Sequence, residues 1–301
     1  MEFLPEGYII FVVCLFGLCF GSFFNVLILR SISGESIVYP PSKCPKCGKT
    51  LKPWHNIPVL SYIFLRGKCA FCKEHISLQY PIVELLTMAL FLLCYLRFGL
   101  DLKAIMAVFI CCSLVVMSGT DIKEKMVDCN IAIILGIAGL IYNYFIGGNI
   151  IGAVLGAIAG VLIIELIANS GRLFVKTRAF GEADTYVAAA LGACFGLRGL
   201  LLVLLYTLIA SMVYMVPVFL YKQYKADNKP VCIMSVVFIL AALTVKTLVQ
   251  NYYTAALVLI SGSMLTYLIL KDLRNKSGND DFTYFPLVPF LSAGALYYLL
   301  F

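Results

Sequence analysis

The amino-acid sequence predicts an all-α polytopic membrane protein with about ten transmembrane helices. Of its 301 residues, 62% are hydrophobic and only 13% are charged, and the mean hydropathy is +0.96. Apolar segments of about 17 to 25 residues recur along most of the chain, and each is long enough to cross roughly 30 Å of hydrocarbon. In a membrane protein the distribution of basic residues reflects topology, so the net charge of +7 does not indicate a nucleic-acid partner, and none is expected.

The first apolar segment, residues 8–29, lies in a predicted first helical domain of residues 1–29. It follows Glu2 and Glu6 and precedes Arg30. Because it lacks the basic start and the small-residue cleavage site of a secretory signal, we expect a permanent helix with its amino terminus outside. The polar segment that follows is then cytoplasmic.

The later spans are expected at residues 81–97, 104–120, 129–147, 149–169, 186–197, 199–221, 231–249, 253–270 and 285–301. The division between the sixth and seventh spans falls at Gly196-Leu197-Arg198-Gly199. With ten spans, the basic residues outside are only Arg97, Lys103, Arg198 and Lys246. The positive-inside rule therefore favours ten spans over a merged segment of residues 186–221.

The polar stretch of residues 30–80 contains two Cys-x-x-Cys pairs, Cys44/Cys47 and Cys69/Cys72. Each pair closes a tight turn that directs both sulfurs at one ion, so the spacing predicts a tetrahedral four-thiolate zinc site. A loop of this size cannot bury a core of its own. The metal is therefore expected to be its main fold determinant.

Two features lie inside the fifth predicted span. Residues 147–160, GGNIIGAVLGAIAG, space small residues at three and four, which is typical of close helix contacts rather than of a nucleotide loop. Glu165 is an intramembrane carboxylate, so it is either functional or reaches water at the inner end of the span.

Two aspartates stand where predicted spans meet the cytoplasm: Asp121 after the third span and Asp184 before the sixth. Two carboxylates at one membrane face can share a proton, one activating water as general base and the other acting as general acid. Helix dipoles favour Asp121 as the proton donor and Asp184 as the base. The alternatives are a helix N-cap for Asp184 and a solvated loop acid for Asp121.

Three segments carry a resemblance to a known family: GSFFNVLILR (residues 21–30), NIPVLSYIFLRGKC (residues 56–69) and QYPIVELLT (residues 79–87). Together with the Cys pairs, they resemble the amino-terminal half of the type IV prepilin peptidases, the bacterial leader peptidase/N-methyltransferases. The match runs in order along the chain, so it is more specific than any single motif.

The resemblance implies that Asp121 and Asp184 are the catalytic pair. In that family one catalytic aspartate follows the third span in an Asp-x6-Pro-Asp/Asn pattern, and the other ends a Gly-x-Gly-Asp motif. The sequence departs from both patterns, because Asp128 and Cys129 stand where Pro-Asp/Asn is usual and Ala183 replaces the second glycine.

The resemblance also implies a domain plan. The family usually has eight spans, so residues 81–301 form the expected peptidase core, with residues 231–270 as an inserted accessory hairpin. PLVPFLS (residues 286–292) is similar to a family Pro-Phe-Gly-Pro-Phe-Leu-Ala motif. Asn25, Arg30 and Glu84 match motif positions and are candidates for S-adenosylmethionine binding or substrate docking; a polar helix contact, a snorkelling arginine and a helix-start carboxylate are the structural alternatives.

The implied activity is aspartic endopeptidase cleavage of the basic leader of type IV prepilin or pseudopilin precursors, after a Gly, with N-methylation of the new amino terminus. The implied location is the bacterial cytoplasmic (inner) membrane, with the active site facing the cytoplasm and lipid as the surrounding partner. A rival hypothesis is an ion or solute transporter with an ion path along Asp121, Glu165 and Asp184 and a regulatory zinc loop.

Overall fold

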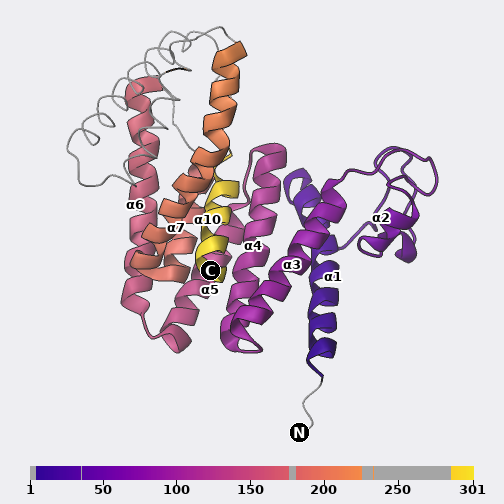
Figure 1. The fold of residues 1–301 in the computed structure, drawn as a ribbon, viewed down its shortest axis with the longest axis horizontal. Helices are drawn as coiled ribbons and strands as arrows, with labels where there is room; N and C mark the ends of the chain where they lie inside the picture. Colours follow the sequence, from indigo (N-terminus) through magenta and orange to yellow (C-terminus); the bar gives the residue numbers. More distant parts are fainter. Residues whose placement is uncertain (1–4, 35, 176–180, 226–232, 234–285) are drawn as a thin grey trace. The chain divides into compact units, whose positions relative to one another are not determined.

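The computed structural model (Figure 1) describes residues 5–34, 36–175, 181–225, 233 and 286–301. The segment that holds the two Cys-x-x-Cys pairs, within the polar stretch of residues 30–80, is called the Cys-containing loop below. It carries two isolated β-bridges, Lys43 with Thr50 and Lys68 with His75. The helical elements are α1 (Glu6–Ser33), η1 (Pro53–Asn56), α2 (Leu60–Phe64), α3 (Gln79–Phe98), α4 (Leu102–Glu124), α5 (Cys129–Tyr142), the π-helical turn η2 (Asn143–Gly147), α6 (Ile150–Val175), α7 (Glu182–Lys225) and α10 (Val288–Leu300).

Two compact units divide the chain. The first comprises Met1–Ile164, Glu182–Thr207 and Pro286–Phe301, and the second comprises Glu165–Gly181 and Leu208–Phe285. The Cys-containing loop, both candidate aspartates and α10 belong to the first unit. The site described below is therefore built within one unit.

Six of the described helices are long and apolar enough to cross a membrane: Glu6–Ser31, Gln79–Phe98, Leu102–Glu124, Cys129–Gly147, Ile150–Asn169 and Glu182–Ser211. The prediction of an all-α polytopic membrane protein is confirmed. The count of ten spans stays a prediction, because the predicted spans 231–249 and 253–270, and with them the predicted accessory hairpin, lie outside the described residues except for residue 233.

Glycines bring α1 and α3 into backbone contact. A Cβ added at Gly17 would lie 2.6 Å from the Met88 Cα, and one at Gly21 would lie 2.6 Å from the Glu84 Cα. Position 17 faces 88 and position 21 faces 84, so the two helices run antiparallel. This Gly-x-x-x-G pair joins helices through close packing, which is how helices associate where lipid removes the hydrophobic driving force.

Two glycines of residues 147–160, Gly156 and Gly160, pack helices together, as predicted for this stretch. A Cβ at Gly156 would meet the carbonyl oxygen of Gly192, and one at Gly160 would lie 2.5 Å from the carbonyl oxygen of Ala188. The backbone of α6 therefore lies directly against the first part of α7, and the two segments run antiparallel.

The helix α7 is broken at Gly196, whose φ of 71° and ψ of 178° are not helical. That conformation is essentially restricted to glycine. Before the break, Ala190 lies against Gly136 and Ala193 lies against Gly139, so this segment runs parallel to α5. The predicted division between residues 186–197 and 199–221 coincides with the break.

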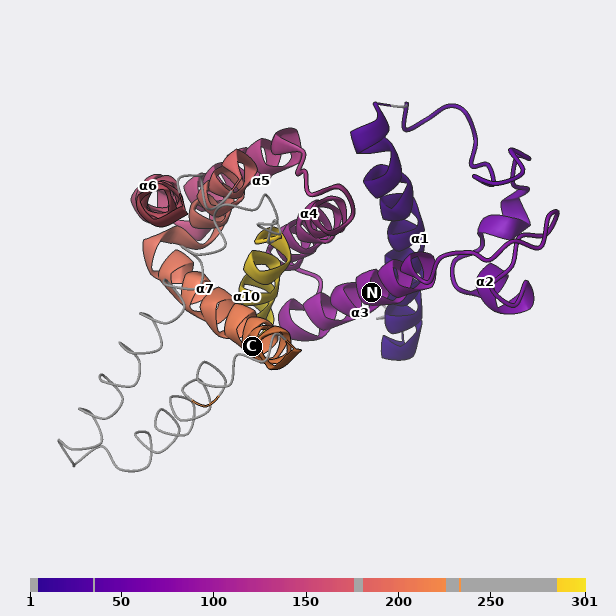
Figure 2. The ribbon, with the colours of Figure 1, turned by 90° about the horizontal axis from the view of Figure 1, so that it is seen from above.

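After the break, the chain runs in the opposite direction. Gly199 lies against Tyr298, and Gly294 lies against Val203, so this segment is antiparallel to α10. On its other side α10 packs antiparallel to α4, through a hydrogen bond between Ser118 and Ser292, and it lies between α4 and α7 (Figure 2). The second segment of α7 therefore runs in the same direction as α4, whereas the first segment runs in the same direction as α5. Because α4 and α5 are antiparallel, the two segments of α7 form a hairpin that turns at Gly196.

The contact between α6 and α7 predicts that Gly156→Leu destabilises the protein. The added side chain would have to displace backbone, and overpacking of this kind costs about 1–3 kcal/mol or more. Thermal unfolding of the purified protein in detergent measures the loss. Gly7→Leu is the matched control, since a Cβ there meets no atom within 4 Å; equal melting temperatures for the two variants would contradict the packing described.

Candidate functional site

Asp121 lies in the last turn of α4 with no solvent exposure. Its Oδ2 accepts a hydrogen bond from the backbone N–H of Val288 at 3.2 Å. Val288 is the first residue of α10, so the amino terminus of α10 points at this carboxylate. One turn earlier on α4, Ser118 donates to the Oγ of Ser292 at 2.7 Å, and the two contacts fix α4 and α10 in register.

Asp184 lies in the first turn of α7 and is 2% exposed. The helix already begins at Glu182, so Asp184 is inside the first turn rather than in front of the helix. An acid in this position is stabilised by the helix dipole. The next residue, Thr185, is buried as well, which makes this turn a buried polar segment at the start of an apolar helix.

Both aspartates lie at the same end of the first unit. Asp121 stands just before the turn that joins α4 to α5, and the first segment of α7 runs parallel to α5, so α7 starts where α5 starts. Consistently, the Glu182 carboxylate is near enough to Cys129 to act on it electrostatically. The Cys-containing loop leaves from this end too, because Ile28 near the end of α1 packs on Gly119 near the end of α4.

The neighbouring acids have other environments. Asp128 caps α5, since its carboxylate accepts from the N–H of Asn130 at 2.9 Å. Glu182 is exposed. Glu165 belongs to the second unit, where it accepts a hydrogen bond from Asn169 one turn away at 3.2 Å. Asp121 and Asp184 are therefore buried, whereas the other acids named in this paragraph are not.

Two helix dipoles act on Asp121 in opposite directions. The carboxyl end of α4 disfavours a negative charge there, whereas the amino end of α10 favours one. The prediction of Asp121 as the proton donor was based on the dipole of α4 alone. With the dipole of α10 acting in the opposite direction, helix dipoles do not decide which aspartate donates the proton.

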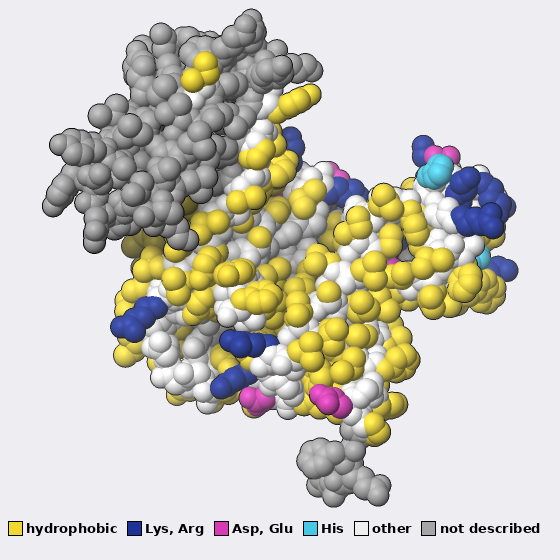
Figure 3. All heavy atoms as spheres, viewed as in Figure 1, with side chains coloured by type: hydrophobic (Ala, Val, Ile, Leu, Met, Phe, Trp, Pro, Cys, Tyr) yellow, Lys and Arg dark blue, Asp and Glu magenta, His cyan; other side chains and the backbone are white. Residues whose placement is uncertain are grey.

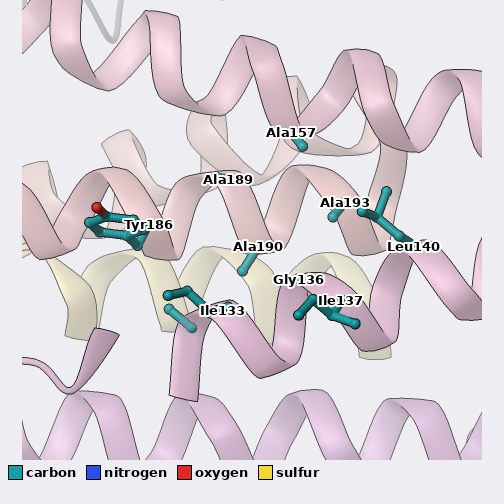
Figure 4. A pocket seen from close by; sticks show the side chains of 10 residues that line it. Ile133, Gly136, Ile137, Leu140, Ala157, Tyr186, Ala189, Ala190 and Ala193 are labelled. Atoms are coloured by element: carbon teal, nitrogen blue, oxygen red, sulfur yellow. The ribbon is translucent and has the colours of Figure 1, made fainter. Parts of the chain in front are cut away.

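A shallow hollow lies between α5, α6 and the first segment of α7 (Figure 4). Its lining is formed by Ala132, Ile133, Gly136, Ile137, Leu140, Ala157, Tyr186, Ala189, Ala190 and Ala193. Only Tyr186 contributes a polar side chain to this set. The hollow thus offers no group that would hold a metal or a charged substrate.

The four cysteines of the two pairs converge. The sulfurs of Cys44, Cys47, Cys69 and Cys72 all lie within 4.8 Å of one another, and the Cys44 and Cys72 sulfurs are 3.8 Å apart. The sulfurs of a tetrahedral four-thiolate site with metal–sulfur bonds of about 2.3 Å are about 3.8 Å apart. The cluster can therefore hold one metal ion.

The two Cys pairs sit in equivalent knuckles, residues 42–51 and 67–76, related by a shift of 25 positions. The Cys44 N–H donates to the Lys49 carbonyl at 3.0 Å, and the Cys69 N–H donates to the Glu74 carbonyl at 2.8 Å. Each knuckle also contains one antiparallel bridge at matching positions. The loop is thus a pseudo-symmetric pair of half-sites that meet at the four sulfurs.

Cys69 is prepared to act as a thiolate. Backbone N–H groups of Cys72 and Phe71 hydrogen-bond to its sulfur and lower the pKa of the thiol to about 6. A metal ligand must be deprotonated, so this sulfur could bind a metal ion at neutral pH without the full cost of losing its proton.

Asn25, Arg30 and Glu84 are all buried, and each bonds the loop or its border to the helices. The Asn25 side chain donates to the carbonyl of Tyr80 at 3.1 Å. Glu84 accepts from the N–H of Val59 at 2.7 Å. The Arg30 guanidinium donates to backbone carbonyls in the stretch just after α1, those of Ser36, Ile37 and Pro40.

Sequence reasoning did not identify the Ser118–Ser292 pair or the N–H of Val288 as part of the site. The serines are 174 positions apart, and no local pattern links them. The one available signal was the PLVPFLS stretch, which marks the start of α10.

The chain is similar to known proteins over most of the segments described above. Two family models match: the bacterial peptidase A24 N-terminal domain over residues 15–98 and the type IV leader peptidase family over residues 108–216. The first covers α1, the Cys-containing loop and α3, and the second covers both Asp121 and Asp184. No solved structure matches the chain.

Several relatives are named prepilin leader peptidase/N-methyltransferase. The Myxococcus xanthus (strain DK1622) protein is 38% identical over 200 residues, 65% of this chain and 60% of that protein. The Burkholderia pseudomallei (strain 1026b) protein is 32% identical over 234 residues, 69% of this chain and 76% of that protein. The Bacillus subtilis (strain 168) protein is 32% identical over 210 residues, 67% of this chain and 80% of that protein. The chain therefore belongs to the type IV leader peptidase family.

Proposed function

We propose that this chain is a membrane aspartyl endopeptidase that cleaves the basic leader of type IV prepilin or pseudopilin precursors after a Gly. The observation that carries the proposal is the burial of two carboxylates, Asp121 and Asp184, at one end of the helical bundle. Buried carboxylates in a membrane protein are costly and mark functional sites. The family membership supports this assignment.

The chemistry requires two carboxylates that share one proton. The ionised aspartate takes a proton from water as the water attacks the scissile carbonyl, and the protonated aspartate gives a proton to the leaving amide nitrogen. Like charges at one site disfavour double ionisation, which keeps one of the two protonated.

The amino terminus of α10 positions one member of the pair. The Val288 N–H donates to Asp121 Oδ2 at 3.2 Å and holds this carboxylate at the start of α10. The Ser118–Ser292 hydrogen bond one turn away keeps this N–H in place. Ser118 and Ser292 thus act as positioning residues for Asp121.

The expected orientation places this end of the bundle in the cytoplasm, in the bacterial inner membrane, with the amino terminus outside. Residues 34–78, which connect α1 to α3 at this end, contain seven Lys and Arg residues and two acids, Glu35 and Glu74, as the positive-inside rule expects of a cytoplasmic loop. A substrate leader held by its own basic residues at the same face could reach both aspartates. The transporter alternative is not favoured by the family or by the names of the relatives.

The metal proposed for the Cys cluster is structural zinc. Zinc prefers a closed tetrahedral thiolate site, and the 3.8 Å sulfur separation fits that geometry. Four protein ligands leave no open position, so the metal would fold the loop rather than act on substrate.

The methyltransferase part of the relatives' name implies S-adenosylmethionine, which supplies an electrophilic methyl group for the new amino terminus. The Asn25 Oδ1 is buried and has no hydrogen-bond partner among the described residues, so it suits a donor group of such a cofactor. Arg30 and Glu84 would shape this site indirectly, by holding the loop to α1 and α3.

Replacing either aspartate by Asn is predicted to abolish leader cleavage, because Asn keeps the shape but cannot exchange a proton. The loss should reach at least about 100-fold for a general acid or base. Mass spectrometry of a co-expressed pilin precursor reports both cleavage and methylation.

Matched controls are Asp128→Asn, which keeps an N-cap on α5, and Glu182→Gln at an exposed position. Both should retain substantial cleavage. Near wild-type cleavage by Asp121→Asn or Asp184→Asn would show that the pair is misassigned.

Ser292→Ala and Ser118→Ala are predicted to lower kcat for cleavage several-fold with little change in KM, because each loosens the N–H that holds Asp121. The double variant should be no worse than either single variant, since both remove the same bond. Ser113→Ala is the control, because Ser113 bonds within α4, to the Phe109 carbonyl. Additive losses in the double variant would argue against a shared positioning role.

Cys69→Ser is predicted to lower the metal content from about one ion per chain and to destabilise the loop, because one of four thiolate ligands is lost. Metal analysis of the purified protein measures this. Cys19→Ser, at an exposed position in α1, should leave the metal in place. Full metal occupancy after loss of two of the four clustered cysteines would contradict the site.

A further inference from the structure

The Cys-containing loop exposes a group of large apolar side chains. Trp54 is 59% exposed, Ile57 45%, Leu60 52%, Ile63 62% and Phe64 81%; we call these five residues the α2 face. They belong to η1, α2 and the turn between them. A contiguous exposed group of this kind marks an interaction surface rather than a face in contact with water alone.

The opposite side of α2 packs on the second knuckle and gives the helix its orientation. Tyr62 is partly buried, its hydroxyl donates to the Ile76 carbonyl at 3.5 Å, and its ring lies against Gly67. Ser61 and Leu65 are partly buried as well. The short helix is therefore amphipathic, with Leu60, Ile63 and Phe64 directed away from the knuckles.

The loop is fastened beside the helices at the level where α3 begins. The residue before α2, Val59, donates to Glu84 in the second turn of α3. At this start of α3, Leu78 just before the helix is 63% exposed and Ile82 in its first turn is 58% exposed. The α2 face is thus attached next to the lipid-facing surface of α3.

The space-filling view shows how the polar and apolar side chains of the loop divide (Figure 3). Hydrophobic side chains gather on the lower side of the loop in that view, continuous with the apolar surface of the helices, whereas Lys, Arg and His side chains lie mainly on its upper and outer sides. Near the α2 face, Lys52 lies over the Trp54 ring at 5.2 Å. Long basic side chains and a tryptophan at an apolar border are typical of a bilayer interface.

We infer that the α2 face is seated in the interface of the lipid bilayer, with Trp54 at headgroup level and the loop's basic residues near anionic phospholipid headgroups. The excess of seven Lys and Arg residues over two acids in residues 34–78 complements an anionic leaflet. The apolar face enters the acyl boundary as an interfacial amphipathic helix does. This seating holds the Cys cluster at the membrane surface, and it does not depend on the peptidase assignment.

The chain contains a single tryptophan, Trp54, so fluorescence excited selectively at tryptophan reports on this face alone. The full chain is reconstituted into phosphatidylcholine bilayers whose acyl chains are brominated near the headgroup, with and without phosphatidylglycerol. The expected result is strong quenching by the brominated lipid and weak quenching by aqueous acrylamide. Strong acrylamide quenching without bromolipid quenching would overturn the inference.

A double variant, Ile63→Asp with Phe64→Asp, should lose most of the bromolipid quenching and gain severalfold in acrylamide quenching, because two carboxylates would leave the acyl boundary. Thr50→Asp, at an exposed position of the first knuckle, is the control and should behave as wild type. Metal content equal to that of the wild type shows that the loop of the double variant still folds. If the double variant loses its metal, the milder variant Phe64→Ser takes its place in the quenching experiment. Unchanged bromolipid quenching in a folded α2-face variant would also overturn the inference.

A pilin precursor is the other occupant that an apolar face could take. If bromolipid fails to quench Trp54 and the fluorescence changes only when precursor is added, the face binds substrate and the lipid assignment is wrong. Loss of cleavage activity with bromolipid quenching intact would instead bear on the peptidase proposal alone.

Discussion

A carboxylate buried among membrane-spanning helices has to be solvated by the protein itself, and this constraint organises the first unit. Asp121 has no solvent exposure, so the groups that solvate it in place of water must come from backbone or polar side chains. The N–H of Val288 meets this need because it is one of the first N–H groups of α10, which have no partner within their own helix. The start of α10 therefore has to lie against the end of α4, and the Ser118–Ser292 bond holds it there.

Close contacts between helices then place the second aspartate. In lipid, helices gain little from hiding apolar surface from one another, so small residues that allow backbone contact decide which helices pair. Gly156 and Gly160 of α6 receive the backbone of α7, and the turn at Gly196 lets the chain run back along α10. The start of α7, with Asp184, is thereby brought to the end of the bundle where α5 begins.

The Cys-containing loop shows how polar residues near the membrane can serve architecture. Asn25, Arg30 and Glu84 were singled out by their match to family motifs, and in the structure each bonds backbone of the loop or of its border with α3. A buried polar side chain that satisfies backbone groups both fixes a segment and avoids the cost of an unpaired group. The same bonds set the level of α2 beside α3, which links the fold of the Cys-containing loop to the position of its apolar face.

The sequence by itself determined the membrane class, the approximate bounds of the six spans found among the described residues, and the four clustered cysteines. It could do so because hydropathy and Cys-x-x-Cys spacing are local properties of the chain. Motif matches also singled out Asp121 and Asp184, but not what surrounds them. Only the tertiary structure decided that a backbone N–H 167 positions away binds Asp121, that Asp128 caps α5 instead, and that a second dipole offsets that of α4. These features depend on which helix ends meet, and helix packing is set by contacts between residues that no local pattern connects.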